Sequence, residues 1–362
     1  MGRWARLPGA ILAAVFVCAA CAVQRVPIGA GPPFLRSAGL VRISDLRAIS
    51  PPAWAPDGRH LAFGTADALW SVRPEAGDAG RRRIAAAAGA ERVAWSPDGR
   101  TLAALVRGRL LGYALDDPSP RALVPDVVVR DYAWPPPGRG GFERGTFAGA
   151  GPVYATSNGA GVALWTVPAS GAAVRIGSLP PGLEMHTLVW LSGNAGLAVT
   201  AGDRGAADRV VFFRVGVRAA PRVQVLPPGG RDPVPSPEGR FIAYLDGAAA
   251  SGAGEGEARV AVMRADGTGR RALTPPGRYS GVAWSPAGTV VAYARAESGR
   301  VALEIAGALT GERLWLGDYR PEAAPPQAPI AIVWSPDGTR LAFGTDTGRR
   351  EGFVWVATLE RR

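Results

Sequence analysis

Lysine does not occur in this sequence of 362 residues, and cysteine and histidine occur only twice each. The 41 basic residues are therefore all arginine. Both cysteines, Cys18 and Cys21, lie near the N-terminus, so the remainder of the chain can form no disulfide and offers no thiolate. The histidines, His60 and His186, have no second histidine or cysteine at metal-ligand spacing. We therefore expect neither a metal nor another cofactor.

Common enzyme motifs and helical patterns are missing as well. The sequence has no Gly-x-Ser-x-Gly nucleophile motif and no Gly-x-x-x-x-Gly-Lys phosphate loop. No segment after the N-terminus keeps the apolar period of a helix over several turns. Glycine (49 residues) and proline (33 residues) are abundant, as many short strands and turns require. These features favour an all-β protein that is not an enzyme.

One phrase recurs along the chain. Trp-Ser-Pro-Asp-Gly begins at Trp95 and Trp334, and close copies begin at Trp54 and Trp284. A weaker copy begins at Pro235, and two degenerate copies begin at Trp134 and Trp190. The seven positions are 39 to 56 residues apart. A period in this range is typical of propeller blades or solenoid units.

The phrase predicts a hairpin turn. Pro97 sets the φ angle of the second turn position, Asp98 suits the third, and Gly99 accepts a left-handed conformation at the fourth. Apolar runs at 93–95 and 101–105 flank the turn and read as its two strands. The recurring aspartate is therefore interpreted as a turn residue and not as a catalytic acid.

Two further strands follow in each repeat. Third strands are expected at 68–72, 109–115, 162–167, 210–215, 259–263, 301–305 and 353–358. Fourth strands are expected at 41–43, 83–85, 122–124, 174–176, 223–226, 271–273 and 313–316. The chain thus begins with a fourth strand (40–45) and ends on a third strand (352–360).

Pairing of these two terminal strands would close a ring and remove an open sheet edge. The sequence therefore predicts a seven-bladed β-propeller of four-stranded antiparallel blades, with the anchor tryptophans packed between blades. A six-bladed ring is the alternative, if the unit near Trp190 or Pro235 is not a full blade. Residues 40–362 are expected to form this single domain.

The N-terminus has the features of an export signal. Two arginines precede an apolar stretch at 7–20. Residues 18–21 read Cys-Ala-Ala-Cys and resemble the lipobox of bacterial lipoproteins. That resemblance implies a signal peptide at 1–20 and a lipid on Cys21. An uncleaved anchor is the alternative. Both readings place the propeller on a flexible tether (21–39), anchored to the cell membrane and facing the periplasm or the exterior.

The net charge of +11 has two interpretations. Arginine pairs and triplets fall in different repeats, so a ring would spread them around a solvated rim. This distribution argues against a nucleic-acid site. Attraction to an anionic envelope polymer remains open. We expect a monomer.

A candidate binding site lies at one mouth of the central channel. Polar residues just before the innermost strands would converge there: Arg92, Arg130, Asp131, His186, Asp232, Arg278 and Tyr279. The other interpretation is that these are ordinary polar strand ends. Long loops at 135–151, 247–257 and 317–329 form a second candidate surface, because loops on rigid scaffolds often carry recognition.

Residues 95–103 (Trp-Ser-Pro-Asp-Gly-Arg-Thr-Leu-Ala) and 334–343 resemble the WD40-like (PD40) repeat of TolB-type propellers. The resemblance implies a propeller and, in that family, binding of an envelope lipoprotein. The leading hypothesis is an envelope lipoprotein that binds a protein or an envelope polymer without catalysis. A small-ligand sensor or carrier is the second hypothesis, and a hydrolase or lyase with a channel active site is the third.

Overall fold

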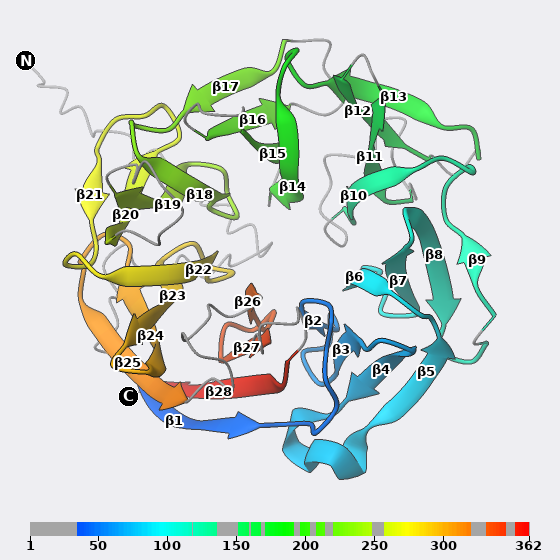
Figure 1. Cartoon of the computed structure of the whole chain (residues 1–362), viewed down its shortest axis with the longest axis horizontal. Helices are drawn as coiled ribbons and strands as arrows, with labels where there is room; N and C mark the ends of the chain where they lie inside the picture. The colour runs from blue at the N-terminus through cyan, green and yellow to red at the C-terminus, as the bar shows by residue number, and fades with distance from the viewer. Residues whose placement is uncertain are drawn as a thin grey trace, which may run out of the picture.

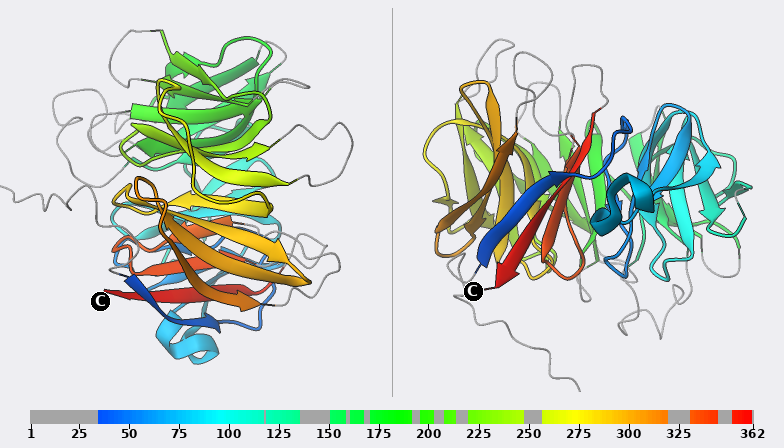
Figure 2. Two further views of the ribbon diagram at one scale, coloured as in Figure 1. Left: turned by 90° about the vertical axis from the view of Figure 1, so that its left-hand side faces the viewer. Right: turned by 90° about the horizontal axis from the view of Figure 1, so that it is seen from below.

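The computed structural model describes residues 35–117, 119–135, 151–158, 161–167, 171–191, 196–202, 208–213, 220–247, 257–319, 331–344 and 352–361. Their strands form seven four-stranded antiparallel sheets around a central axis (Figure 1). Side views show a thick disc and not a stacked rod (Figure 2). The predicted seven-bladed propeller is confirmed, and the six-bladed alternative is wrong, because the units at Trp190 and Pro235 are both complete blades.

The blades follow one another in chain order, each from its innermost strand outwards. Blade 1 contains β2 (Ala53–Trp54), β3 (Leu61–Gly64), β4 (Ala68–Val72) and β5 (Arg82–Ala86). Blade 2 contains β6 (Ala90–Trp95), β7 (Thr101–Val106), β8 (Arg109–Ala114) and β9 (Arg121–Ala122). Blade 3 contains β10 (Val129–Ala133), β11 (Val153–Asn158), β12 (Gly161–Thr166) and β13 (Val174–Ser178). Blade 4 contains β14 (Glu184–Leu191), β15 (Gly196–Gly202), β16 (Arg209–Phe213) and β17 (Arg222–Val225).

The remaining strands complete the ring. Blade 5 contains β18 (Gly230–Pro235), β19 (Phe241–Gly247), β20 (Ala258–Arg264) and β21 (Arg271–Ala272). Blade 6 contains β22 (Arg278–Trp284), β23 (Val290–Glu297), β24 (Arg300–Gly307) and β25 (Arg313–Tyr319). Blade 7 contains β26 (Ala331–Trp334), β27 (Arg340–Gly344), β28 (Val354–Arg361) and, outermost, β1 (Leu35–Arg42). A short 3-10 segment, η2 (Pro74–Gly80), lies between β4 and β5 and is kinked at Gly77, where the backbone angles are not helical.

The ring closes as predicted, by pairing of the first strand with the last. β1 runs antiparallel to β28, with Leu40 opposite Ala357. The strand begins at Leu35, earlier than the predicted start at residue 40, because Leu35 and Leu40 both pack against the apolar cluster between blades 6 and 7. The expected signal peptide, Cys21 and most of the expected tether lie outside the described residues.

The recurring phrase forms the same turn in five blades. The amide of Gly99 donates to the carbonyl of Ser96 at 2.9 Å, and Gly58, Gly239, Gly288 and Gly338 make the equivalent bond. Gly99 has φ of +70°, which only glycine adopts without strain. The Asp98 carboxylate accepts hydrogen bonds from the Ser96 hydroxyl at 2.6 Å and the Arg100 amide at 3.0 Å. The aspartate therefore holds the turn together, as the sequence indicated.

The anchor tryptophans join neighbouring blades. The indole N–H of Trp95 donates to the carbonyl of Ala53 in the preceding blade at 3.2 Å. Trp54, Trp190, Trp284 and Trp334 make the same bond to the blade before them, at 2.9–3.3 Å. Trp54 reaches Val333 and so links blade 1 to blade 7. The predicted packing of these residues between blades is confirmed.

The core is divided among the blade interfaces. The described residues form seven apolar clusters, and each contains buried residues from two adjacent blades. A single blade therefore buries its two faces only when both neighbours are present. In the part of the chain that the structure describes, no helix is long and apolar enough to cross a membrane.

Candidate functional site

Five innermost strands carry a β-bulge near their start, at the same end of the ring. The register shifts occur in β6, β10, β14, β18 and β22. A bulge inserts an extra residue and re-aims its side chain. The inserted positions include three of the predicted site residues, namely Arg130, His186 and Asp232. The bulges thus turn polar side chains out of the regular alternation of the inner strands.

Asp131 ties three blades together at this end. One carboxylate oxygen lies 2.8 Å from Nε of Arg92 in blade 2, and the same oxygen accepts a hydrogen bond from the Tyr132 amide. The other oxygen accepts a bond from the amide of Leu188 in blade 4, at 2.7 Å. The Asp131 side chain is only 4% exposed. Two of the predicted residues, Arg92 and Asp131, are therefore brought into direct contact.

Burial and these contacts act in opposite directions on Asp131. Desolvation raises the pKa of its carboxyl group above the ordinary value. The charge of Arg92 and the amides of Leu188 and Tyr132 oppose that rise, because they stabilise the ionised form. Arg92 is thus the only charged group among these three partners, and its charge favours the ionised form of the Asp131 carboxyl group.

A second set of polar contacts connects blades 4 and 5. Nε2 of His186 lies 3.6 Å from a carboxylate oxygen of Asp208, and the other Asp208 oxygen accepts a bond from the Asp232 amide at 3.0 Å. A Cβ at Gly202 would lie 2.7 Å from His186 and 2.9 Å from Asp208, so the glycine makes room for this pair. Asp232 has φ of +53° and extends its side chain to Arg231 at 3.2 Å. Polar contacts therefore link successive inner strands from blade 2 to blade 5.

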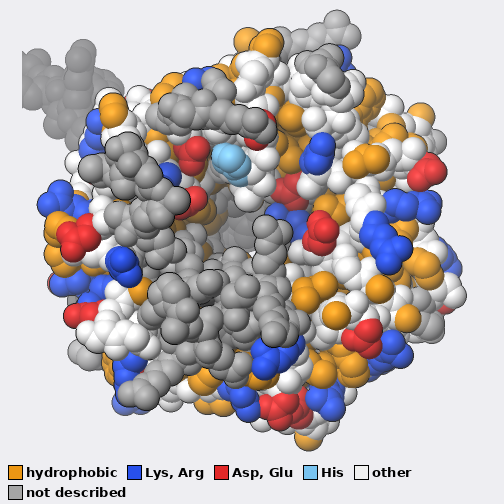
Figure 3. Space-filling model, in the orientation of Figure 1, with side chains coloured by type: hydrophobic (Ala, Val, Ile, Leu, Met, Phe, Trp, Pro, Cys, Tyr) orange, Lys and Arg blue, Asp and Glu red, His pale blue; other side chains and the backbone are white. Residues whose placement is uncertain are grey.

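The other predicted residues differ in exposure. Arg130 and Arg278 are exposed, at the starts of β10 and β22. Tyr279 is buried instead, with its ring edge-on to Tyr293 at 5.6 Å between centroids, so it belongs to the core of blade 6. Figure 3 shows a hollow at the centre of the ring on one face, with acidic, basic and histidine side chains around it.

Asp208 was not among the residues predicted from the sequence. It precedes the third strand of its blade, and no motif marks it, so only the fold shows that it bridges His186 and Asp232. Most of the three long loops lies outside the described residues, although Gly317–Tyr319 belong to β25 and not to a loop. Among the described residues, no group of three or more histidine, cysteine or acidic side chains could hold a metal ion.

Comparison with known structures establishes the class of fold. An oligogalacturonate lyase solved with manganese has a TM-score of 0.60 and 12% identity, over 90% of this chain and 95% of that one. Hydrazine synthase from Kuenenia stuttgartiensis has a TM-score of 0.57 and 14% identity, over 87% and 95%. The propeller domain of Swd1 from Myceliophteria thermophila has a TM-score of 0.55 and 14% identity, over 89% and 98%.

A protein described as TolB from Agrobacterium tumefaciens is also similar, at 15% identity and a TM-score of 0.47. No family model matches the sequence. The search of curated proteins finds no match either. The chain is a seven-bladed β-propeller, which is the class of fold that the recurring phrase predicted. At these identities the likenesses show the fold alone.

Proposed function

We propose that this protein is a non-catalytic binding module of the cell envelope, lipid-anchored through Cys21, and that its bulged mouth binds an acidic segment of a partner protein. The exposed guanidinium groups of Arg130 and Arg278 at the starts of two inner strands carry this proposal. Incorporation of a radioactive fatty acid that Cys21→Ala abolishes would test the anchor.

The ring gives the mouth the rigidity that recognition needs. The polar contacts of Asp131 and Asp208 fix the inner strands of blades 3, 4 and 5 relative to one another. A partner therefore meets side chains already in place, which lowers the entropic cost of association. The net charge of +11 would also speed the approach of an acidic partner.

A lyase shares the fold, so a channel active site is the competing function. This competing function can be tested by incubating the full chain with oligogalacturonate and detecting unsaturated products by their ultraviolet absorbance. We expect no product above the background of a heat-denatured sample. Product release that requires Arg92 or His186 would replace the binding proposal.

The binding proposal can be tested with a fluorescent peptide of alternating glutamate and glycine, and a matched peptide with glutamine in place of glutamate. The detergent-solubilised full chain should bind the acidic peptide, with affinity that falls as salt increases. Arg130→Glu and Arg278→Glu should each weaken binding about tenfold, which corresponds to about 1.4 kcal/mol.

Arg175→Glu is the matched control, because Arg175 is exposed on the outermost strand of blade 3 and its substitution changes the net charge equally. Fluorescence anisotropy should give the same affinity for this variant as for the native chain. Equal weakening by all three substitutions would mean that overall charge attracts the peptide, and the mouth would not be the site.

A further inference from the structure

A cleft of about 480 Å³ lies between blades 1 and 2, away from the bulged mouth. Its walls include residues of two Pro-Asp-Gly turns, at 56–58 and 97–99. These turns connect the ends of β2 and β6 to the next strands, so they lie at the opposite end of the inner strands from the bulges. The cleft is therefore separate from the site proposed above.

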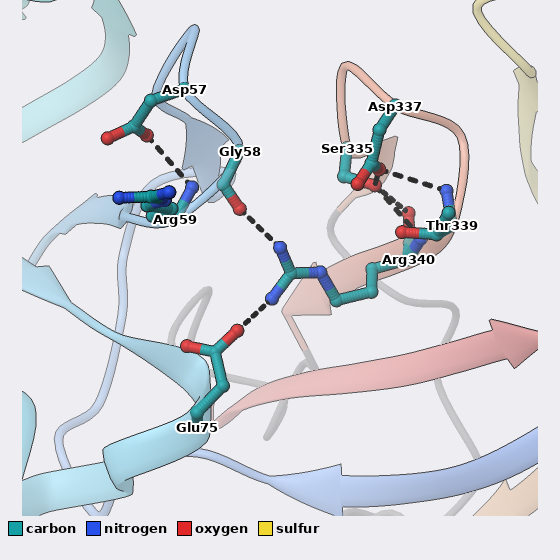
Figure 4. Close-up of polar contacts among 8 residues, drawn as sticks. All are labelled: Asp57, Gly58, Arg59, Glu75, Ser335, Asp337, Thr339 and Arg340. Carbon is teal, nitrogen blue, oxygen red and sulfur yellow. Dashed lines mark hydrogen bonds and ion pairs between the residues drawn. The ribbon is translucent and has the colours of Figure 1, made fainter.

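The helix η2 forms one side of this cleft. Among the described residues, no other connection between a third and a fourth strand contains a helix. Glu75 of η2 forms an ion pair with Arg340 of blade 7, and Arg340 also donates to the carbonyl of Gly58 at 2.5 Å (Figure 4). Asp78 accepts a bond from the Ser44 hydroxyl at 3.0 Å. These contacts fix η2 from the side of blade 7 and leave its other side to the cleft.

Three arginines lie along the η2 side. Arg82 donates to the carbonyl of Leu115 across the blade boundary at 2.6 Å. The Arg81 guanidinium lies 5.6 Å from the centre of the Trp70 ring and 3.3 Å from Asp78. Arg73 is exposed, and its side chain has no hydrogen-bond or ion-pair partner among the described residues. Arg73 is thus free to receive an anionic group.

Two carboxylates lie on the turn side of the same cleft, Asp57 and Asp98. Hydrogen bonds from the Ser96 hydroxyl and then the Arg100 amide lower the pKa of Asp98. Burial alone would raise the pKa of Asp57, but bonds from the Arg59 amide and His60 lower it. Both groups are therefore negatively charged at neutral pH. Asp57 lies 3.2 Å from Nδ1 of His60, which also lines the cleft. Within the described residues, neither carboxylate forms an ion pair with an arginine of the cleft, so the lining presents groups of both charges.

An apolar surface also lines the cleft. Ile84, Trp95 and Leu115 contribute to it. The indole N–H of Trp95 is already bonded to Ala53, so the ring offers the cleft only apolar and aromatic contact. A ligand that matches this lining carries a negative group, a positive group and an apolar body.

We propose that this cleft binds a small zwitterion with an apolar side chain, of the amino-acid type. Its carboxylate pairs with Arg73, its ammonium group faces Asp57 and Asp98, and its side chain lies on Trp95 and Ile84. A single charge of either sign would leave one side of the cleft unmatched. This site does not depend on the function proposed for the mouth.

Three probes of similar shape test the charge requirement: L-phenylalanine, 3-phenylpropionate and 2-phenylethylamine. Saturation-transfer NMR titrations with the full chain should show that phenylalanine binds at least about tenfold more tightly than either singly charged analogue. Arg73→Gln should weaken phenylalanine and phenylpropionate about tenfold and leave phenylethylamine unchanged, because only the first two carry a carboxylate.

Two further variants make the result decisive. Arg59 is an exposed arginine directly after the turn at 56–58, and it does not line the cleft. The Arg59→Gln variant should therefore bind all three probes as the native chain does. Ala79→Trp, at an exposed position of η2 that does line it, should abolish phenylalanine binding without threatening the fold. Equal affinity for the three probes, no binding of any probe, or no effect of Arg73→Gln would overturn the proposal. Arg130→Glu should leave phenylalanine binding intact, which separates this site from the mouth.

Discussion

A single buried carboxylate does much to fix the mouth at the residue scale. Asp131 accepts one contact from blade 2 and one from blade 4 while it belongs to blade 3. Its neighbour Tyr132 reinforces the same junction, because the phenol donates to the carbonyl of Ala103 at 2.9 Å. An unpaired buried charge is far more costly than a paired one. The positions of Arg92 and Asp131 are therefore energetically coupled.

Arg92→Gln should destabilise the protein by about 2 kcal/mol at neutral pH, because it leaves the Asp131 carboxylate with amide donors alone. The pKa of Asp131 is already raised in the folded state, and loss of the Arg92 charge raises it further. A folded pKa above the unfolded value of about 3.9 means that stability falls as pH rises through the folded pKa. The deficit should therefore be small below about pH 4 and largest at neutral pH in urea unfolding curves.

Two controls accompany that experiment. Arg92→Lys keeps the charge and should recover part of the loss. The double variant Arg92→Gln with Asp131→Asn has no ionisable group at this position, so the extra pH dependence should disappear. A deficit of equal size at acid and neutral pH would show that Arg92 acts through packing alone.

The indole hydrogen bonds between blades can be measured one at a time. Trp284→Phe keeps the aromatic packing but leaves the carbonyl of Val234, now bonded at 2.9 Å, without its donor. We expect a loss of about 1–2 kcal/mol in the free energy of unfolding. Trp134→Phe is the matched control, because the buried Trp134 indole N–H has no partner among the described residues. Denaturant titration should show a clearly smaller effect for Trp134→Phe, and equal losses would contradict the role given to the bond.

At the scale of strands and turns, the sequence predicted most of the fold because the determinants are local. The third strand expected at 68–72 is β4, and the turn at 96–99 has the hydrogen bonds that its residues favour. Strand ends were less accurate. Gly317–Tyr319 extend β25 because Tyr319 packs against Phe343 and Trp355 of the next blade, which the local sequence does not reveal.

The candidate site was predictable only in outline. The position of Arg130 and His186 before inner strands follows from the repeat, but the bulges that re-aim them depend on strand pairing. Tyr279 has the same sequence context and is buried, because Tyr293 lies beside it. The cleft beside η2 was not foreseen at all, since its walls come from two blades and only their assembly creates it.

At the scale of the whole molecule, the stability of the fold depends on an unbroken ring of blades. Every apolar cluster needs two neighbouring blades, so an opening at one interface exposes apolar surface on both sides of the gap. The closing blade is the vulnerable one, because its four strands come from both ends of the chain. Three sets of contacts stabilise this blade and its boundary with blade 1. They are the hydrogen bond from Trp54 to Val333, the ion pair of Arg340 with Glu75, and the pairing of β1 with β28.

Removal of residues 1–42 should therefore open the ring, because β28 would lose its partner β1 and present an unpaired edge. Because a whole strand pairing is lost, we expect the Tm to fall by more than about 10 °C. We also expect aggregation that increases with protein concentration. Removal of residues 1–34 is the control, since it keeps β1 intact. Calorimetry and light scattering on both proteins provide the readout. Equal stability of the two would mean that blade 7 holds with three strands, and that the N-terminal strand is not what closes the ring.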